Sequence, residues 1–212
     1  MNRPRLTSRV EEGRRLDLLY WPLARSMRVA ATAASGGGVG PRDWILNAQV
    51  PSGYGRVDVT AHVRELATSL GLAGDGVGLL TAAAVRGVRH ATDEGVDAHV
   101  TVGLARPTWA AAPDGDGDDA SAAGTINIVV FVPAALSDAA LCNALTTATE
   151  AKCQALFDEG VAGTGTASDA VCVVSPGDGD GDVFAGPRSR WGSRLARCVY
   201  AAVRDGARRH SQ

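Results

Sequence analysis

The sequence predicts a single α+β domain, with sheets packed between helix layers in an αββα-like arrangement. Short apolar runs bounded by glycine, proline and polar turns occur in groups, a pattern typical of strands. Three longer segments carry apolar residues at helical spacing. Grouped strands with helices between them favour an α+β fold over a regularly alternating α/β fold. The chain has 212 residues, 45% of them hydrophobic, which is enough for one buried core.

In the first half of the chain, strands are expected over residues 27–34, 44–50, 76–84 and 98–105. A helix is expected between the second and third of these strands. Its signals are a cap, apolar residues at helical spacing and a final glycine: Asp58, Val59, Val63, Leu66, Leu70 and Gly71.

The two ends of the chain carry little that a core would bury. Residues 1–15 are polar and rich in arginine, and residues 208–212 resemble them. We therefore expect a poorly ordered segment over residues 1–25 and the functional domain over residues 26–206.

The second half opens with a loop of small and polar residues over 111–124. The apolar run from Ile126 to Val132 is typical of a strand buried on both faces. Ser137 is expected to cap a long helix that ends before Gly160. A further strand over residues 170–174 leads to a last helix, whose inward residues are Trp191, Leu195, Val199 and Ala202.

The charge balance argues against nucleic acid and membranes as partners. The 21 basic and 23 acidic side chains give a net charge of -2, so no strong field would hold an anionic polymer or lipid. No window approaches the roughly 18 apolar residues of a membrane span, and the N-terminus lacks the apolar region of a signal peptide. We expect a cytoplasmic protein.

The four cysteines include no C-x-x-C pair and are too sparse to cross-link a chain of this length. They predict neither a zinc site nor a disulfide framework, and we expect free thiols and no metal. Lys152 is the only lysine. A coding bias toward arginine accounts for that as well as any chemistry, so the pattern assigns it no function.

Several motifs have a functional and a plain interpretation. The aspartate-rich stretches 114–119 and 178–182 suggest calcium, but they lack the glycine and glutamate spacing of an EF-hand and favour solvated loops. Residues 36–40 are glycine-rich without the spacing of a nucleotide-binding loop. The arginines of the last helix are typical of a solvated face more than of an anion site. His62 lies one position off an apolar stripe, which favours a histidine at the core boundary.

The segment 163–169 is the strongest candidate for a site. It places three hydroxyls and a carboxylate, those of Thr164, Thr166, Ser168 and Asp169, between a long helix and a buried strand. Such a loop suits binding and catalysis. An ordinary connection built of turn-forming residues is an equally weighted alternative.

Taken together, several stretches between about residues 27 and 202 resemble the adenosylcobinamide amidohydrolase family of cobamide salvage. They are Trp44 to Val50, Thr101 to Ala105, Gly124 to Ile128, Thr146 to Ala155, Gly163 to Val171 and Phe184 to Pro187. The two aspartate–glycine loops depart from the family pattern as surface insertions, which bears on access of the substrate.

The resemblance implies hydrolysis of the amide that joins aminopropanol to a propionyl side chain of the corrin ring. The corrinoid would be the substrate, and no cofactor is implied. Such chemistry needs a nucleophile, a proton shuttle and donors for the oxyanion. We expect Asn47 to be an oxyanion or amide donor and Asp169 or Glu150 to be the acid/base. Thr164, Thr166, Ser168, His62 and Thr81 are the candidate substrate-binding residues.

A second resemblance concerns the nucleophile. The run from Gly124 to Val130 is similar to the nucleophile region of self-processing aminopeptidases related to the ornithine acetyltransferases. In those enzymes a freed Ser or Thr amine serves as the base. This resemblance implies Thr125 as the nucleophile, although Thr125 is also a suitable first residue for a buried strand. The alternative functions are a non-catalytic corrinoid-binding module and a self-processing aminopeptidase-like hydrolase.

Overall fold

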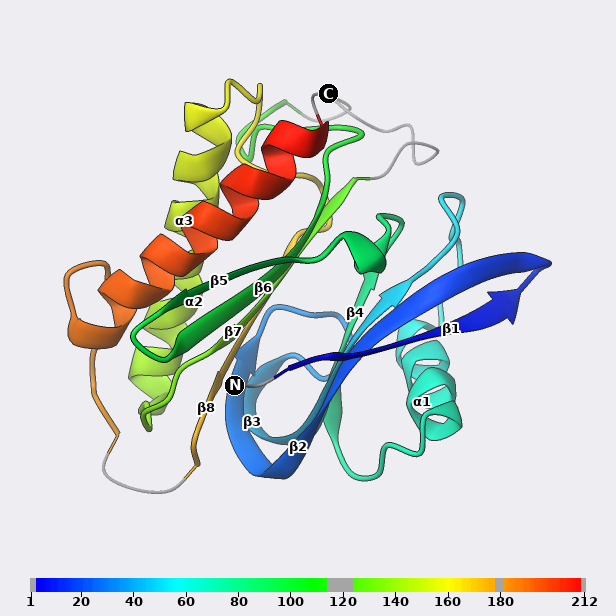
Figure 1. Ribbon diagram of the computed structural model, residues 1–212, viewed down its shortest axis with the longest axis horizontal. Coiled ribbons are helices and arrows are strands. Elements are labelled where there is room, and N and C mark those ends of the chain that lie inside the picture. The colour runs from blue at the N-terminus through cyan, green and yellow to red at the C-terminus, as the bar shows by residue number, and fades with distance from the viewer. Residues whose placement is uncertain (1–2, 114–123, 178–180, 211–212) are drawn as a thin grey trace.

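The computed structural model describes residues 3–113, 124–177 and 181–210 and confirms an α+β domain (Figure 1). The strands are β1 (Arg5–Glu11), β2 (Arg14–Ala31), β3 (Gly38–Gln49), β4 (Gly76–Thr81), β5 (Arg89–Asp93), β6 (Val96–Gly103), β7 (Thr125–Phe131) and β8 (Ala170–Ser175). The helices are α1 (Val59–Ser69), α2 (Asp138–Asp158) and α3 (Arg190–His210), and a 3-10 turn spans Val85–Gly87.

The eight strands form one mixed sheet in the order β4-β3-β2-β8-β7-β6-β5, with β1 paired to β2. The sheet curls on itself. Asn127 of β7 donates to the Leu80 carbonyl of β4 at 3.1 Å, although three strands separate β4 from β7 in the sheet order. Trp21 and Phe131, from the two halves of the sheet, have ring centroids 6.0 Å apart.

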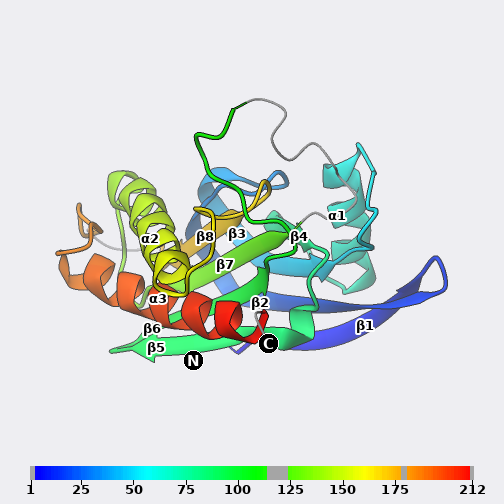
Figure 2. The same cartoon turned by 90° about the horizontal axis from the view of Figure 1, so that it is seen from above.

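The curled sheet gives an αββα-like layering in which both β layers belong to one continuous sheet. Its inner faces share a core that includes Ile45, Leu79 and Val129. Helix α1 packs on the outer face of the β2–β3 half, and helices α2 and α3 pack on the outer face of the half that contains β6 and β7 (Figure 2). Polar side chains on the inner faces are thereby enclosed between the two halves.

The expectation of a poorly ordered segment over residues 1–25 is corrected by the structure. Strands β1 and β2 form a long antiparallel hairpin that turns at Glu12 and Gly13, both with positive φ. Leu16, Leu18 and Trp21 are buried against the rest of the sheet. The neighbouring arginines make the segment polar on average, so its composition alone does not predict a strand that buries these apolar residues.

The second half of the chain follows the sequence pattern closely. All seven residues of β7 are buried, and Ser137 caps α2 by accepting from the Ala140 N–H at 3.2 Å.

In the first half of the chain, the expected helix α1 also forms, but Asp58 makes no side-chain cap bond, because its carboxylate pairs with Arg56 at 2.6 Å. The strand expected over 76–84 ends at Thr81.

The arginine face of α3 is neutralised by acidic side chains. Arg197 bonds Asp93 at 2.6 Å, Arg204 and Arg208 both bond Glu159, and Arg194 pairs with Glu94. These ion pairs agree with the solvated-face interpretation.

Two other motifs of the sequence are placed only in part. The stretch 114–119 lies outside the described residues, as does most of 178–182. In the glycine-rich segment, the carbonyl oxygens of Gly36 and Gly37 accept from Arg42 at 2.9 and 3.2 Å. No helix in the described part of the chain has both the length and the apolar character to cross a membrane.

Candidate active site

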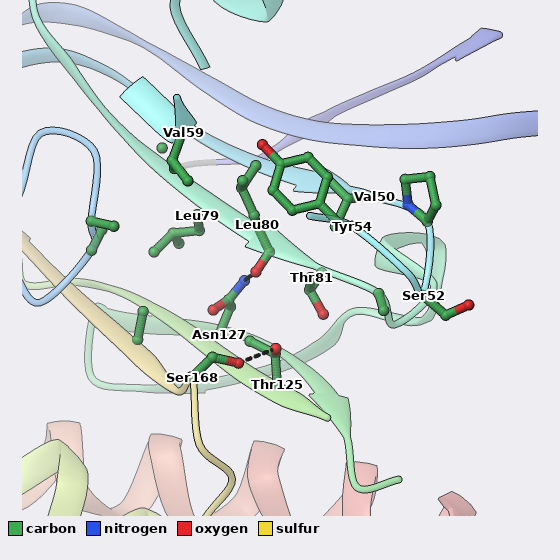
Figure 3. Close-up of a pocket in the computed structure, with 16 residues that line it drawn as sticks. Val50, Ser52, Tyr54, Val59, Leu79, Leu80, Thr81, Thr125, Asn127 and Ser168 are labelled. Atoms are coloured by element: carbon green, nitrogen blue, oxygen red, sulfur yellow. Dashed lines mark hydrogen bonds between the residues drawn. The ribbon is translucent and has the colours of Figure 1, made fainter. Parts of the chain in front are cut away.

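A pocket of about 310 Å³ lies at one end of the space between the two halves of the sheet (Figure 3). Its polar lining residues are Ser52, Tyr54, Thr81, Thr125, Asn127 and Ser168, and most of the remaining wall is apolar. Tyr54 is the only residue in this lining with an ionisable side chain. The pocket therefore presents hydroxyl and amide groups rather than charges.

Thr125 is the first residue of β7 and faces inward, on the same side of the strand as Asn127. Its Oγ1 lies 2.7 Å from the Ser168 Oγ (Figure 3). Ser168 Oγ also lies 3.1 Å from the Gly124 carbonyl oxygen. Ser168 has one hydroxyl hydrogen. When Ser168 donates that hydrogen to Gly124, Thr125 is the donor to Ser168, so the three groups form a directed chain.

Gly124 is held tightly just before Thr125. A Cβ at this position would lie 2.5 Å from the Gly103 carbonyl oxygen, so only glycine fits here. The Gly124 carbonyl oxygen also lies 2.8 Å from the Thr166 hydroxyl. Two hydroxyls, those of Thr166 and Ser168, thus surround the carbonyl that precedes Thr125.

Asp169 is enclosed by donors beneath this chain. Its Oδ1 accepts from the Ile126 N–H at 2.9 Å and from the Thr166 hydroxyl at 2.6 Å. Its Oδ2 accepts from the Thr166 N–H at 3.1 Å and from the Lys152 ammonium at 2.5 Å. The Lys152 and Asp169 side chains are only 8% and 11% exposed. Asp169 therefore fixes the loop after α2 to the start of β7.

A buried amide chain lies behind the pocket. Asn127 Nδ2 donates to Asn47 Oδ1 at 2.9 Å and to the Leu80 carbonyl at 3.1 Å. Asn47 Nδ2 donates in turn to the Thr101 hydroxyl at 3.0 Å. Asn127 lines the pocket. Asn47 does not line it, but lies behind Asn127 and orients the Asn127 amide through the hydrogen bond between them.

His62 on α1 is also one layer removed from the pocket. It is 3% exposed, and its Nδ1 lies 2.8 Å from the hydroxyl of Tyr54, a residue of the pocket wall. The two rings stack with centroids 5.5 Å apart. Burial lowers the pKa of His62 and raises the pKa of Tyr54. His62 therefore holds Tyr54 in place.

We expect the stability of the protein to fall with pH partly through His62. Burial holds its folded-state pKa below the ordinary value of 6.5, so unfolding takes up a proton in the interval below pH 6.5. The stability from neutral His62 is present above that interval and is lost as the pH falls through it. The measurement is the melting temperature at about pH 7.5 and about pH 5.5. The drop should be smaller for His62→Gln than for the wild type; equal drops would contradict this assignment.

The structure does not bring every expected residue to the pocket. Glu150 is exposed on α2 and does not line it, because it lies on the solvent side of the helix. Thr164 accepts from the Ala110 N–H at 3.0 Å and is not among the lining residues. Thr81 lines the pocket, with its hydroxyl accepting from the Ala83 N–H at 3.0 Å.

Sequence reasoning missed Asn127, Lys152 and Tyr54. Asn127 is the one amide in the apolar run of β7, a signal that was present in the sequence. Lys152 is the only lysine and falls on the buried side of α2, where a charge has to be paired. Tyr54 lies in a turn without periodicity, and no signal in the sequence points to it.

Among the described residues, no three His, Cys, Asp or Glu side chains converge in a group that could hold a metal ion. The fold and the pocket define an α+β protein with a small hydroxyl-lined and amide-lined site. The family model described as adenosylcobinamide amidohydrolase matches residues 3–212, and the chain belongs to this family. That match confirms the resemblance seen in the sequence and includes the hairpin at the N-terminus.

Individual relatives agree with the family assignment. The chain is 29% identical over 186 residues to an adenosylcobinamide amidohydrolase of Methanosarcina mazei, which covers 84% of this chain and 88% of the relative. It is 40% identical over 133 residues to an adenosylcobinamide amidohydrolase of Halobacterium salinarum, a match that covers 59% of this chain and 56% of the relative.

The solved structure of the L-aminopeptidase D-Ala-esterase/amidase of Ochrobactrum anthropi aligns with 96% of this chain and 82% of its own chain, with 13% sequence identity and a TM-score of 0.40.

Proposed function

We propose that this chain hydrolyses the amide between aminopropanol and the corrin side chain of adenosylcobinamide, and so releases adenosylcobyric acid for cobamide salvage. Family membership supports the substrate. The observation that carries the reaction is the Thr125 hydroxyl in the pocket, 2.7 Å from the Ser168 hydroxyl. A hydroxyl carried on a strand is held in a fixed position, as a nucleophile requires.

The pocket volume bears on how the substrate binds. At about 310 Å³, the pocket is at the lower end of the roughly 300–1,000 Å³ common for small-molecule sites. It has room for the aminopropanol arm and its amide but not for a substituted corrin macrocycle. We therefore place the macrocycle at the mouth of the pocket, with the arm directed inward.

In the proposed mechanism, Thr125 Oγ1 attacks the amide carbonyl carbon and loses its proton as the C–O bond forms. The C–N bond then breaks, and the departing nitrogen takes up a proton as aminopropanol leaves. Water hydrolyses the resulting ester, which yields the carboxylic acid and restores the threonine hydroxyl. Asn127 and Ser168 are the polar groups beside Thr125 in the pocket wall.

The base for this step is found by elimination among the expected residues. Asp169 is occupied by four donors, Glu150 is exposed on α2, and His62 lies behind Tyr54. We propose that the α-amine of Thr125 serves as the base. It is freed when Thr125 Oγ1 attacks the Gly124 carbonyl carbon, the Gly124–Thr125 C–N bond breaks, and water hydrolyses the resulting ester to leave a carboxylate on Gly124. The Ser168 hydroxyl supports this step, because it donates to the Gly124 carbonyl oxygen at 3.1 Å and would stabilise the oxyanion formed there.

The direct test of function is to incubate the purified chain with adenosylcobinamide and to measure free aminopropanol by mass spectrometry. Release of aminopropanol together with adenosylcobyric acid supports the proposal. Corrinoid that binds and is recovered unchanged would indicate a binding module instead. Release of amino acids from small peptides, without action on the corrinoid, would indicate an aminopeptidase.

Chelation is expected to leave the reaction unaffected. In the proposed mechanism a threonine hydroxyl, not a metal-bound water, attacks the amide. The hydrolysis rate should therefore be the same with and without EDTA, measured by aminopropanol release after dialysis. Loss of activity that only added zinc restores would contradict a metal-free reaction.

We also propose that the protein works in the cytoplasm. The four cysteines, Cys142, Cys153, Cys172 and Cys198, are free thiols. Unpaired cysteines are the usual state of proteins in a reducing compartment, which supports this location.

A further inference from the structure

The Asn127 side chain has one polar atom whose role the proposed mechanism leaves open. Its Oδ1 is buried and accepts no hydrogen bond from any residue that the structure describes. Asn127 is 1% exposed and forms part of the pocket wall. A buried acceptor without a donor is unfavourable and is uncommon in folded proteins.

The direction of this oxygen is determined by a backbone group. The Leu80 carbonyl can only accept, so the atom that faces it at 3.1 Å must be the Asn127 amide nitrogen. The second hydrogen of that nitrogen goes to Asn47 Oδ1 at 2.9 Å, and Asn47 in turn donates to Thr101 at 3.0 Å. Rotating the Asn127 amide would place two acceptors against each other, so Oδ1 is the atom of this side chain that no described residue satisfies.

Figure 3 shows Asn127 between Leu80 and the pair formed by Thr125 and Ser168, with Leu79 beside it. Ala170, which pairs with Asn127 between β7 and β8, also lines the pocket, so much of the wall beside Asn127 is apolar. A ligand that satisfies this site must carry an O–H or N–H donor on a short apolar arm.

From these observations we infer that Asn127 Oδ1 accepts a hydrogen bond from the hydroxyl of the leaving alkanolamine. The residue would then select amides whose nitrogen carries a hydroxyl two carbons away. This inference rests on the proposed function and identifies the hydroxyl of the leaving group as the part of the substrate that the pocket recognises.

Spacing favours the hydroxyl over the amide N–H as the donor. Thr125 and Asn127 are two residues apart on one face of β7, which places them about 7 Å apart along the strand. The amide nitrogen is one bond from the carbon that Thr125 attacks, too close to Thr125 to reach Asn127. The hydroxyl is four bonds from that carbon, about 5 Å in an extended chain, and the attack distance of about 3 Å completes the span.

The test compares two substrates on the wild-type protein. One is adenosylcobinamide, and the other is the propylamide of adenosylcobyric acid, which lacks only the hydroxyl. We expect kcat/KM for the propylamide to be about 100-fold lower than for adenosylcobinamide, because removing the hydroxyl leaves Oδ1 unpaired. Asn127→Leu should act on adenosylcobinamide more slowly and should reduce the preference to within a few-fold.

A matched control is Thr81→Val, which removes another polar group of the same pocket. The Thr81 hydroxyl accepts from the Ala83 N–H, so this variant should keep the wild-type preference whatever its absolute rate. Equal turnover of the two amides by the wild type would overturn this inference and leave the proposed function standing. No turnover of either amide would contradict the proposed function. Melting curves of each variant show whether it folds, and the wild-type comparison does not depend on them.

Discussion

Thr125→Val is expected to abolish hydrolysis of adenosylcobinamide while the protein still folds. Valine keeps the shape and strand preference of threonine but lacks the hydroxyl that would attack the amide. The rate should fall by at least about 1,000-fold, as is usual when a nucleophile is removed. Unfolding should become easier by at most about 1–2 kcal/mol, because only the bond to Ser168 is lost. Initial rates and melting curves on the same preparations measure both effects.

Thr125→Ser is the matched control, since serine keeps the hydroxyl. We expect it to retain activity. An active Thr125→Val variant would remove the nucleophile role and return Thr125 to being the first residue of a buried strand.

Intact-mass analysis extends this test to the proposed base. The wild type should appear as two fragments, residues 1–124 and 125–212, and Thr125→Val as one chain. One uncut mass with full wild-type activity would contradict a freed amine as the base.

The elements of the second half of the chain could be predicted because local and global signals agree there. The apolar run from Ile126 is buried on both faces, and the Ser137 cap is followed by a regular apolar stripe. The N-terminal hairpin could not be predicted in this way. Its strand β2 is interrupted by an irregularity between Pro22 and Met27, which breaks the alternation that marks a strand.

The site was only partly predictable, for a reason that lies in the topology. The hydroxyls of segment 163–169 lie close together in the sequence, and Thr125 was expected from the resemblance to self-processing aminopeptidases. Asn127 is marked in the sequence as the one amide in an apolar run, but its hydrogen-bond partner Leu80 is brought to it only by the curl of the sheet, across three strands. Glu150 was expected to be a candidate acid/base and Lys152 was assigned no function, but the helical turn directs Glu150 to solvent and Lys152 to Asp169.

Lys152→Met is expected to be the most destabilising change among the polar residues of the site. Methionine has nearly the same length but leaves the Asp169 carboxylate without its ammonium partner at 2.5 Å. Removing one partner of a buried ion pair costs about 3 kcal/mol or more. The loss also loosens segment 163–169 beneath Thr125, so the hydrolysis rate should fall with it. Denaturant unfolding and initial rates are the measurements.

The double variant Lys152→Met with Asp169→Asn separates the pair from the rest of the network. Neutralising both partners removes the unpaired charge, and the asparagine oxygen can still accept from the Ile126 N–H that bonds Asp169 Oδ1 at 2.9 Å. The double variant should therefore be more stable than the sum of the two single losses predicts, with a coupling energy of about 1–3 kcal/mol. Strictly additive losses would mean that Lys152 and Asp169 act independently despite their contact. Stability recovered without activity would show that the charge pair orients the start of β7 for catalysis in addition to holding the loop.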